Sequence, residues 1–248
     1  TNESDGSIKK WKVNGLEFKK LFLNVTPNFE VLSGNVRMNM RFFNTSTTVG
    51  VVRAEDGQVF NCNGNFTNLN LPVGNYFVPT LEAGGLQCIK LHGTNGTGNF
   101  DFKLNFNTST VSNITYLAYN CRLFNGNIAH FDFSNVENAG RAFQHCNAFN
   151  NDIGGGWDMP KATNVEEMFS TCSNFNQPIN QFKFTGASNL YRVFYACDAL
   201  NQSVRGIEYK DGALLSSTFE SCKSMNHPLD AEELPFPPNV RLRYATLG

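Results

Sequence analysis

Apolar residues in the second half of the chain recur with a period of about 25 residues. Each repeat has a cysteine, a large apolar residue three positions later, an asparagine at four and Ile, Val or Leu at seven. The cysteines, spaced 25, 26, 25 and 25 residues apart, are Cys121, Cys146, Cys172, Cys197 and Cys222. The asparagines are Asn125, Asn150, Asn176, Asn201 and Asn226. A fixed period in this range predicts a solenoid whose repeats pack only on their neighbours.

Two spacings inside the repeat predict its local structure. Apolar residues stand seven and three positions before the cysteine, at the cysteine and three positions after it, as on one face of a helix. The stretch from five to nine positions after the cysteine has a single inward residue, the Ile, Val or Leu at seven, which suits a short strand. We therefore expect one short helix and one short strand in each coil, with the strands of successive coils forming a parallel sheet.

The cysteines are expected to form one buried column of small apolar side chains with weak S–H donors. The asparagines would form a second column whose amides satisfy backbone groups at a tight bend. The alternative is that the cysteines bind a metal or form disulfides. Metal sites normally use close pairs of cysteines, and the sequence has none. Stacked side chains that point the same way have poor geometry for a disulfide, so we expect no metal and no cofactor.

The second and third repeats carry a family resemblance, because residues 135–153 and 162–179 follow one pattern. Its shared positions are Asn138 and Asn164, Phe143 and Phe169, Cys146 and Cys172, Phe149 and Phe175, and Ile153 and Ile179. This pattern resembles the BspA-type leucine-rich repeat, in the variant common in mycoplasma surface lipoproteins and some viruses. It covers about residues 110–230, with Leu200 and Met225 replacing phenylalanine in the last two repeats. The resemblance implies leucine-rich-repeat coils and a surface adhesion or interaction role without catalytic residues.

Residues 1–107 follow a period of two instead. Apolar and polar residues alternate over 36–42 and 100–106, and shorter runs at 11–13, 16–18 and 21–25 suggest further strands near the start. Asp56-Gly57 and Gly74-Asn75 are turn signals. About seven or eight strands at this spacing predict an antiparallel, sandwich-like β domain.

This division gives an α+β chain in three parts. They are a β-rich domain at 1–107, a five-repeat solenoid of about 25 residues per coil at 108–230, and a C-terminal cap at 231–248. The β domain would cover the open end of the first coil, and the proline-rich segment 234–238 would cover the last. Alternatively, residues 1–107 hold decayed coils, since Cys62 and Cys88 lie 26 residues apart. Those two cysteines could also pair as a disulfide.

Charge and motifs speak against several classes of function. The net charge is −1 and only 17% of residues are charged, so there is no basic footprint for nucleic acid. No apolar stretch reaches the length of a membrane-spanning helix. His145 precedes Cys146, but a nucleophilic thiolate would need an exposed cysteine. We therefore expect a non-enzymatic protein without membrane insertion.

Candidate partner-binding residues come from two places in the repeat. Trp157 follows three glycines and is the best candidate for an exposed aromatic anchor. The positions beside the inward Ile, Val or Leu would face solvent, and the candidates there are Asn127, Asp152, Asn180, Arg205 and Asp230. The first hypothesis is an extracellular adhesin or recognition module, on a cell or virion surface, that binds a protein or glycan through the solenoid. The second is a structural subunit of a virion or filament that contacts copies of itself.

Overall fold

The computed structural model describes residues 10–13, 16–19, 27–34, 36–42, 49–62, 69–78, 86–93, 96–103, 106–154 and 157–226. Within these residues the chain forms strands and hydrogen-bonded turns, and no helix. The strands are β1 (Lys10–Val13), β2 (Leu16–Lys19), β3 (Phe29–Ser33), β4 (Val36–Phe42), β5 (Val49–Arg53), β6 (Val59–Cys62), β7 (Leu69–Leu71), β8 (Gly74–Phe77), β9 (Leu86–Gly93), β10 (Asn99–Phe102), β11 (Lys183–Phe184) and β12 (Glu208–Tyr209). The described chain is therefore mostly β, and the α+β prediction is wrong in its helical part.

The strands before residue 103 pair in an antiparallel manner, as the alternating pattern predicts. One sheet has five strands in the order β10-β3-β8-β5-β6, another has three in the order β7-β4-β9, and β1 pairs with β2. The predicted turn at Asp56-Gly57 connects β5 to β6, and Gly57 has a φ of 75°. The predicted turn at Gly74-Asn75 is wrong, because these residues begin β8. The possible strand at 21–25 lies outside the described residues.

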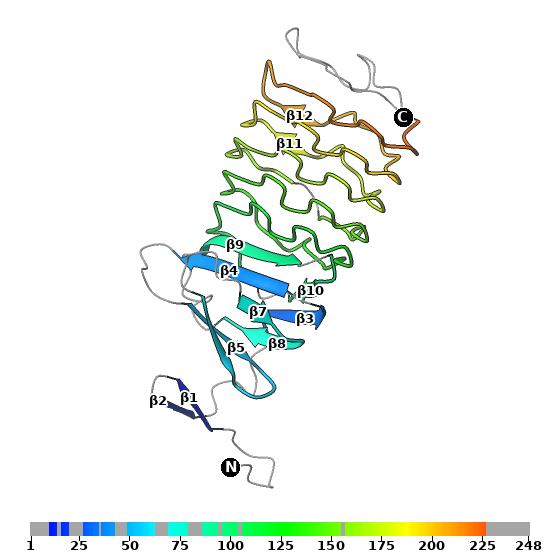
Figure 1. The fold of residues 1–248 in the computed structure, drawn as a ribbon. Helices are drawn as coiled ribbons and strands as arrows, with labels where there is room; N and C mark the ends of the chain where they lie inside the picture. Colours follow the sequence, from blue (N-terminus) through cyan, green and yellow to red (C-terminus); the bar gives the residue numbers. More distant parts are fainter. Residues whose placement is uncertain are drawn as a thin grey trace.

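The repeats stack on one another as coils, which Figure 1 shows in green to orange. In each coil, alternate backbone N–H groups before the cysteine donate to carbonyls of the next coil. The bonds from Phe143 to Met168, Phe169 to Val193 and Phe194 to Thr218 measure 2.8, 2.8 and 3.0 Å. The N–H groups between them close local turns instead. These two sets of bonds satisfy the backbone without a helix.

Left-handed backbone at two positions of each coil explains why no helix forms. Ten non-glycine residues have φ between 53° and 64°: Tyr116, Asn120, Arg141, His145, Glu167, Thr171, Arg192, Ala196, Ser217 and Ser221. They stand five and one positions before each cysteine. A positive φ is typical of the third residue of a type II turn and is incompatible with an α-helix. Successive turns of this kind repeat every three to four residues, so they produce the apolar spacing of a helix face without being one.

The parallel pairing of the coils also lies elsewhere than predicted. The stretch from five to nine positions after the cysteine contains no strand in the described coils. Parallel bridges join Asn113 to Asn138 and Asn138 to Asn164, and the strands β11 and β12 pair further along. In the predicted strand, polar side chains bond to their own backbone: Asp152 Oδ1 accepts from the N–H of Gly154 at 2.8 Å. Such local bonds compete with strand formation.

Parallel aromatic rings fill the interior of the stack. Phe143, Phe169, Phe194 and Phe219 form one column, with ring centroids 5.4, 5.6 and 5.5 Å apart and planes within 10°. The buried residues of the coils and of the N-terminal sheets belong to one hydrophobic core.

Strand β9 covers the first coil. The N–H groups of Leu91 and Gly93 donate to the carbonyls of Leu117 and Tyr119 at 2.7 and 3.1 Å. These bonds repeat the geometry that joins one coil to the next, so β9 takes the place of a preceding coil. The predicted cap at 231–248 lies outside the described residues, and the three-part division stays a prediction.

Candidate functional site

The five repeat cysteines form a fully buried column of free thiols. Each Sγ lies within hydrogen-bonding distance of a backbone carbonyl in the preceding strand or coil; for example, Cys146 donates to Ala118 O and Cys172 to Phe143 O, both at 3.0 Å. Burial raises the pKa of these thiols, and that of Cys222 to about 12. Because a buried, protonated thiol is a poor nucleophile and metal ligand, this column serves packing. The side chains of Cys62 and Cys88 lie outside the described residues.

The repeat asparagines form a second column at the bend after the cysteine. The Oδ1 atoms of Asn125, Asn150, Asn176 and Asn201 accept from the backbone N–H of the asparagine one coil on, at 2.8, 2.8, 2.9 and 3.2 Å. Each amide thus satisfies a backbone donor that the bend leaves without a ladder partner. This column joins the coils, with its members exposed or half-buried at the edge of the stack.

Trp157 is not the exposed anchor that the glycine run suggested. Its side chain is 0% exposed. Its ring centroid lies 4.4 Å from that of Phe133 and 5.1 Å from that of Phe169, and its Nε1 donates to the carbonyl of Ile153 at 2.8 Å. The indole fills the interior and has its polar atom satisfied there. Trp157 therefore cannot reach a partner, and the prediction of a binding role for it is wrong.

The other predicted binding residues stand at two nearby positions of the repeat, Asn127 and Asp152 six positions after a cysteine and Asn180 and Arg205 eight positions after one. Asn127, Asp152, Asn180 and Arg205, which we call the polar row, are exposed. The side chains of Asn127 and Asp152 also accept from the backbone two residues on, at 2.9 and 2.8 Å. Two of the four thus shape their own turns as well as facing solvent. Asp230 lies outside the described residues.

A second outward surface was missed by the sequence analysis. It consists of residues five, two and one positions before the cysteines, with Tyr191 at six, and we call it the tyrosine–arginine face. Its members are Tyr116, Tyr119, Arg141, His145, Glu167, Tyr191, Arg192 and Tyr195. Five of these residues have the left-handed backbone themselves, and Tyr119, Tyr191 and Tyr195 each stand directly before a left-handed residue. All eight are half-buried except Glu167, which is buried. The repeated mixture of tyrosine and charge in these columns was the signal that could have revealed it.

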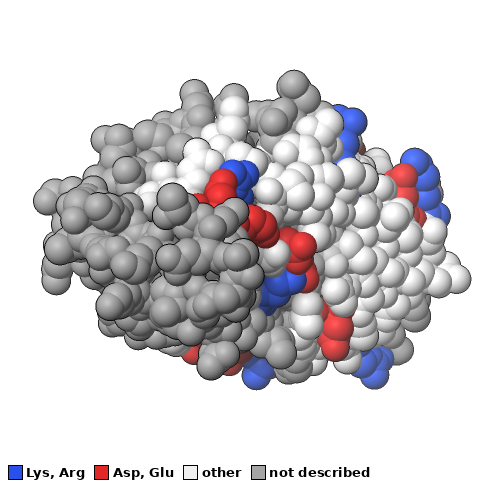
Figure 2. Space-filling model, turned by 90° about the horizontal axis from the view of Figure 1, so that it is seen from below, with Lys and Arg blue, Asp and Glu red and all other residues white. Residues whose placement is uncertain are grey.

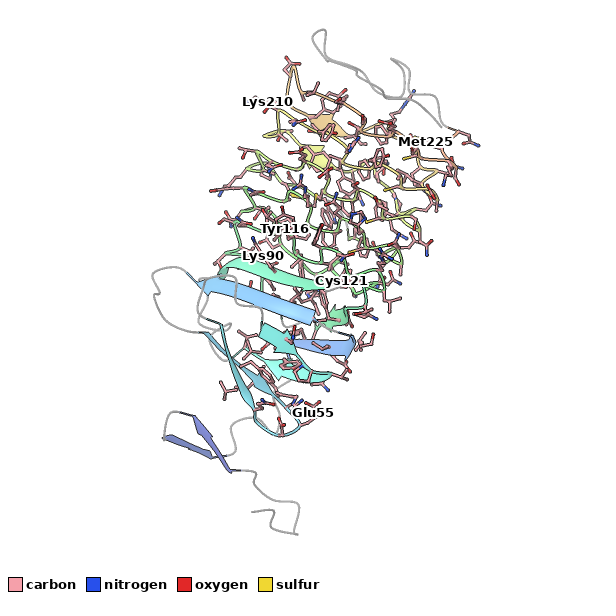
Figure 3. The ribbon with its side chains drawn as sticks, viewed as in Figure 1. Glu55, Lys90, Tyr116, Cys121, Lys210 and Met225 are labelled. Atoms are coloured by element: carbon pink, nitrogen blue, oxygen red, sulfur yellow. The ribbon has the colours of Figure 1, made fainter. Side chains whose placement is uncertain are left out.

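The lower part of this face is a closed network of contacts. Arg141 Nε donates to Glu167 Oε2 at 2.5 Å, and its Nη1 donates to the hydroxyl of Tyr116 at 3.1 Å. Lys90 Nζ, from β9, lies 5.4 Å from the centre of the Tyr116 ring, and Figure 3 shows these two residues together at the base of the stack. Burial, and then the charge of Arg122, lowers the pKa of His145, so its imidazole is neutral at pH 7.

The upper part of the face holds an arginine between two aromatic rings. The guanidinium carbon of Arg192 lies 4.9 Å from the centre of the Tyr191 ring and 4.6 Å from that of Tyr195. Both distances are within the range of cation–π attraction. All three side chains are half-buried. The two rings hold the guanidinium in place at the partly exposed surface of the stack.

The described part of the chain contains no group of three His, Cys, Asp or Glu side chains placed to hold a metal ion. No helix that is long and apolar enough to cross a bilayer occurs there either. Figure 2 shows the acidic and basic residues of the described part of the chain interspersed on the surface seen from below.

Comparison with known protein families identifies the repeated region. The profile of the family described as "Mycoplasma protein of unknown function, DUF285" matches residues 94–207 and, in a second match, residues 154–232. Together the two matches span 94–232, more than half of the 248-residue chain. The chain belongs to the DUF285 family. Overlapping matches to one DUF285 profile are what a periodic sequence produces, because more than one register aligns. No curated protein and no solved structure matches the chain.

Proposed function

We propose that this DUF285 chain is a non-enzymatic recognition module on a cell or virion surface, whose stacked coils bind a protein or glycan partner. In this proposal the repeats are of the BspA-type leucine-rich-repeat class, and the coils form a solenoid that starts at the antiparallel β region. The observation that carries the proposal is the placement of exposed side chains at equivalent positions of successive coils.

The ladder between coils supports this function physically. Backbone bonds of 2.7 to 3.3 Å fix each coil on the next, and the buried ring columns prevent sliding. Side chains on the polar row and on the tyrosine–arginine face are therefore held at fixed spacings before a partner arrives. A preorganised surface loses less conformational freedom on binding, which favours affinity.

The test is a binding screen of the full chain against immobilised glycans and extracellular matrix proteins, with the heat-unfolded chain as control. We expect the folded chain to bind at least one partner with a Kd in the micromolar range or tighter, and the unfolded chain to lose it. Replacing both Asn180 and Arg205 by alanine tests whether the polar row takes part, because neither change removes a buried group. Equal signals from the folded and unfolded chains, or none from either, would argue against recognition.

A second candidate function is a building block of a larger assembly, and one observation favours it. The N–H groups of Ser217, Phe219 and Ser221 occupy the ladder positions of the fifth coil, yet within the described residues none of them has an acceptor. Ladder donors without a partner are a template for pairing with another chain. Light scattering after size exclusion distinguishes the two functions: a constant mass near 27.6 kDa supports the recognition module, and a mass that grows with concentration supports the assembly.

A further inference from the structure

The guanidinium of Arg192 has a buried N–H donor, Nε, without a hydrogen-bond acceptor among the described residues. The rings of Tyr191 and Tyr195 attract the positive charge but accept no bond in the plane of the guanidinium. Buried polar groups in proteins nearly always have a partner. Arg192 as a whole is only half-buried, and its guanidinium has no acceptor among the described residues, so the terminal amino groups are where an external acceptor would bind.

A second arginine at the same repeat position shows what is missing. Arg141, like Arg192, stands five positions before a cysteine and has left-handed backbone. Arg141 bonds to Glu167, which occupies the equivalent position one coil further on, at 2.5 Å. One coil beyond Arg192, that position holds Ser217, which is neutral and buried. The anion that the fold supplies to Arg141 is therefore absent beside Arg192.

We propose that Arg192, held between Tyr191 and Tyr195, binds the carboxylate of an acidic sugar residue at the end of a glycan. This inference rests on the proposed recognition function and names its ligand class. A guanidinium binds a carboxylate through two parallel hydrogen bonds, which an ammonium cannot do. The tyrosine rings beside it offer apolar surface to the C–H groups of the sugar ring, and their hydroxyls can bond to its hydroxyl groups.

The surroundings of Arg192 favour a sugar over an acidic peptide. Glu166 and Glu167 stand at this face in the coil before Arg192, and Glu220 stands in the coil after it. The backbone places them close by, because Glu167 N donates to Tyr191 O and Ala196 N donates to Glu220 O, both at 2.9 Å. A peptide with several carboxylates would meet these like charges, which lowers its affinity. A ligand with one carboxylate and many hydroxyl groups avoids them.

The test measures binding of the full chain to a glucuronoside immobilised on a sensor surface. The matching glucoside is the neutral control, and a glutamate-rich peptide is the peptide control. We expect binding to the glucuronoside and to neither control. Arg192→Lys keeps the charge but removes the planar pair of donors, so it should lower the affinity roughly tenfold or more. Lys210→Ala removes one exposed charge elsewhere in the same repeat and should leave binding unchanged.

A second variant guards against a loss of fold. Tyr195→Leu removes one flanking ring and should weaken glucuronoside binding several-fold, while the thermal unfolding midpoint of each variant reports whether the stack is intact. Failure to bind the glucuronoside, equal binding to the glucoside, or an unchanged affinity in Arg192→Lys would overturn the inference. If the glutamate-rich peptide bound more tightly than the glucuronoside, and Arg192→Lys abolished that binding, the assignment of a sugar ligand would be wrong. The site would then bind acidic peptides. A chain that binds another partner in the screen but not the glucuronoside keeps the recognition function and loses only this inference.

Discussion

Replacing Trp157 by alanine should remove a large part of the free energy of unfolding of the stack, because the indole is the largest side chain in the interior. Its ring lies among Phe133, Phe143, Phe169 and Phe182, with centroid distances of 4.4, 5.5, 5.1 and 5.5 Å. Four aromatic neighbours from three coils leave a cavity that cannot collapse without moving the ring columns. The variant therefore loses both the transfer free energy of the indole and the contacts of its neighbours.

The expected loss follows from these contacts. Truncation of a buried aromatic residue to alanine costs about 3–5 kcal/mol. The carbonyl of Ile153 also loses its bond from Nε1, which adds about 1 kcal/mol. We expect Trp157→Ala to lower the free energy of unfolding by about 5 kcal/mol, a large share of the ~5–15 kcal/mol that natural domains have. Trp157→Phe keeps a ring but loses the bond, so it should cost about 1–2 kcal/mol.

The assay is urea unfolding followed by far-ultraviolet circular dichroism, since the Trp157 variants lack the tryptophan that would report on the interior of the stack. Leu123→Ala is the control, because that side chain is 53% exposed and its truncation should change stability by less than about 0.5 kcal/mol. A loss below about 1 kcal/mol in Trp157→Ala would refute the reasoning, as it would mean that the indole is not enclosed by the four rings.

Three further predictions concern the columns and one surface pair. Asn150→Ala removes the acceptor of the Asn176 N–H and should lower the free energy of unfolding by about 1 kcal/mol in urea titrations, so an unchanged midpoint would contradict the asparagine column. The five buried repeat thiols should resist alkylation by iodoacetamide at pH 8 in the folded chain. Burial raises the pKa of Cys222 to about 12 and also raises the pKa values of the other four repeat cysteines. Alkylated peptides from the repeats in a mass spectrum would contradict this prediction. The side-chain hydrogen bond from Arg53 lowers the pKa of Asp56 to about 2, whereas an unfolded aspartate has a pKa of ~4. The ionised Asp56 carboxylate therefore stabilises the fold fully above about pH 4, and this stabilisation is lost as the pH falls to about 2. The difference in urea midpoint between the parent and Asp56→Asn should shrink across that window, and an equal difference at pH 6 and pH 2 would disprove the link.

The 25-residue period of the sequence was the basis for predicting that the repeats stack and which of their residues form columns. Equal spacing requires equivalent residues to lie above one another, so the columns through Cys146 and Asn150 are visible in the sequence. The alternation over 36–42 likewise predicted β4, because a strand with one buried face needs a period of two.

The local structure of the coil was out of reach for a physical reason. The spacing of Val165, Phe169 and Cys172 fits both a helix and a series of turns. Glycine would have indicated the left-handed turns, but residues such as Glu167 and Thr171 occupy those positions. The bonds to neighbouring coils hold these residues in a conformation that their own preferences disfavour, and tertiary bonds are not readable from local sequence.

The candidate site was missed because its columns do not repeat one residue. Tyr116, Arg141, Glu167 and Arg192 stand at one position of four successive repeats, and no shared phrase marks them. Trp157 was misplaced for the opposite reason, since the glycines before it suggested an exposed loop while its distance from Cys146 places it inside.

The ladder between coils has a consequence for how such a chain can change in length. Every coil offers the same N–H groups to the coil after it and the same carbonyls to the coil before it, as the bonds of Phe143 and Phe169 show. Any coil therefore fits on any other. Loss or duplication of one 25-residue unit in the gene would leave each remaining backbone bond with a matching partner. The reach of the protein from its β9 base can thus grow or shorten by whole coils, and each step carries a new set of outward side chains with it.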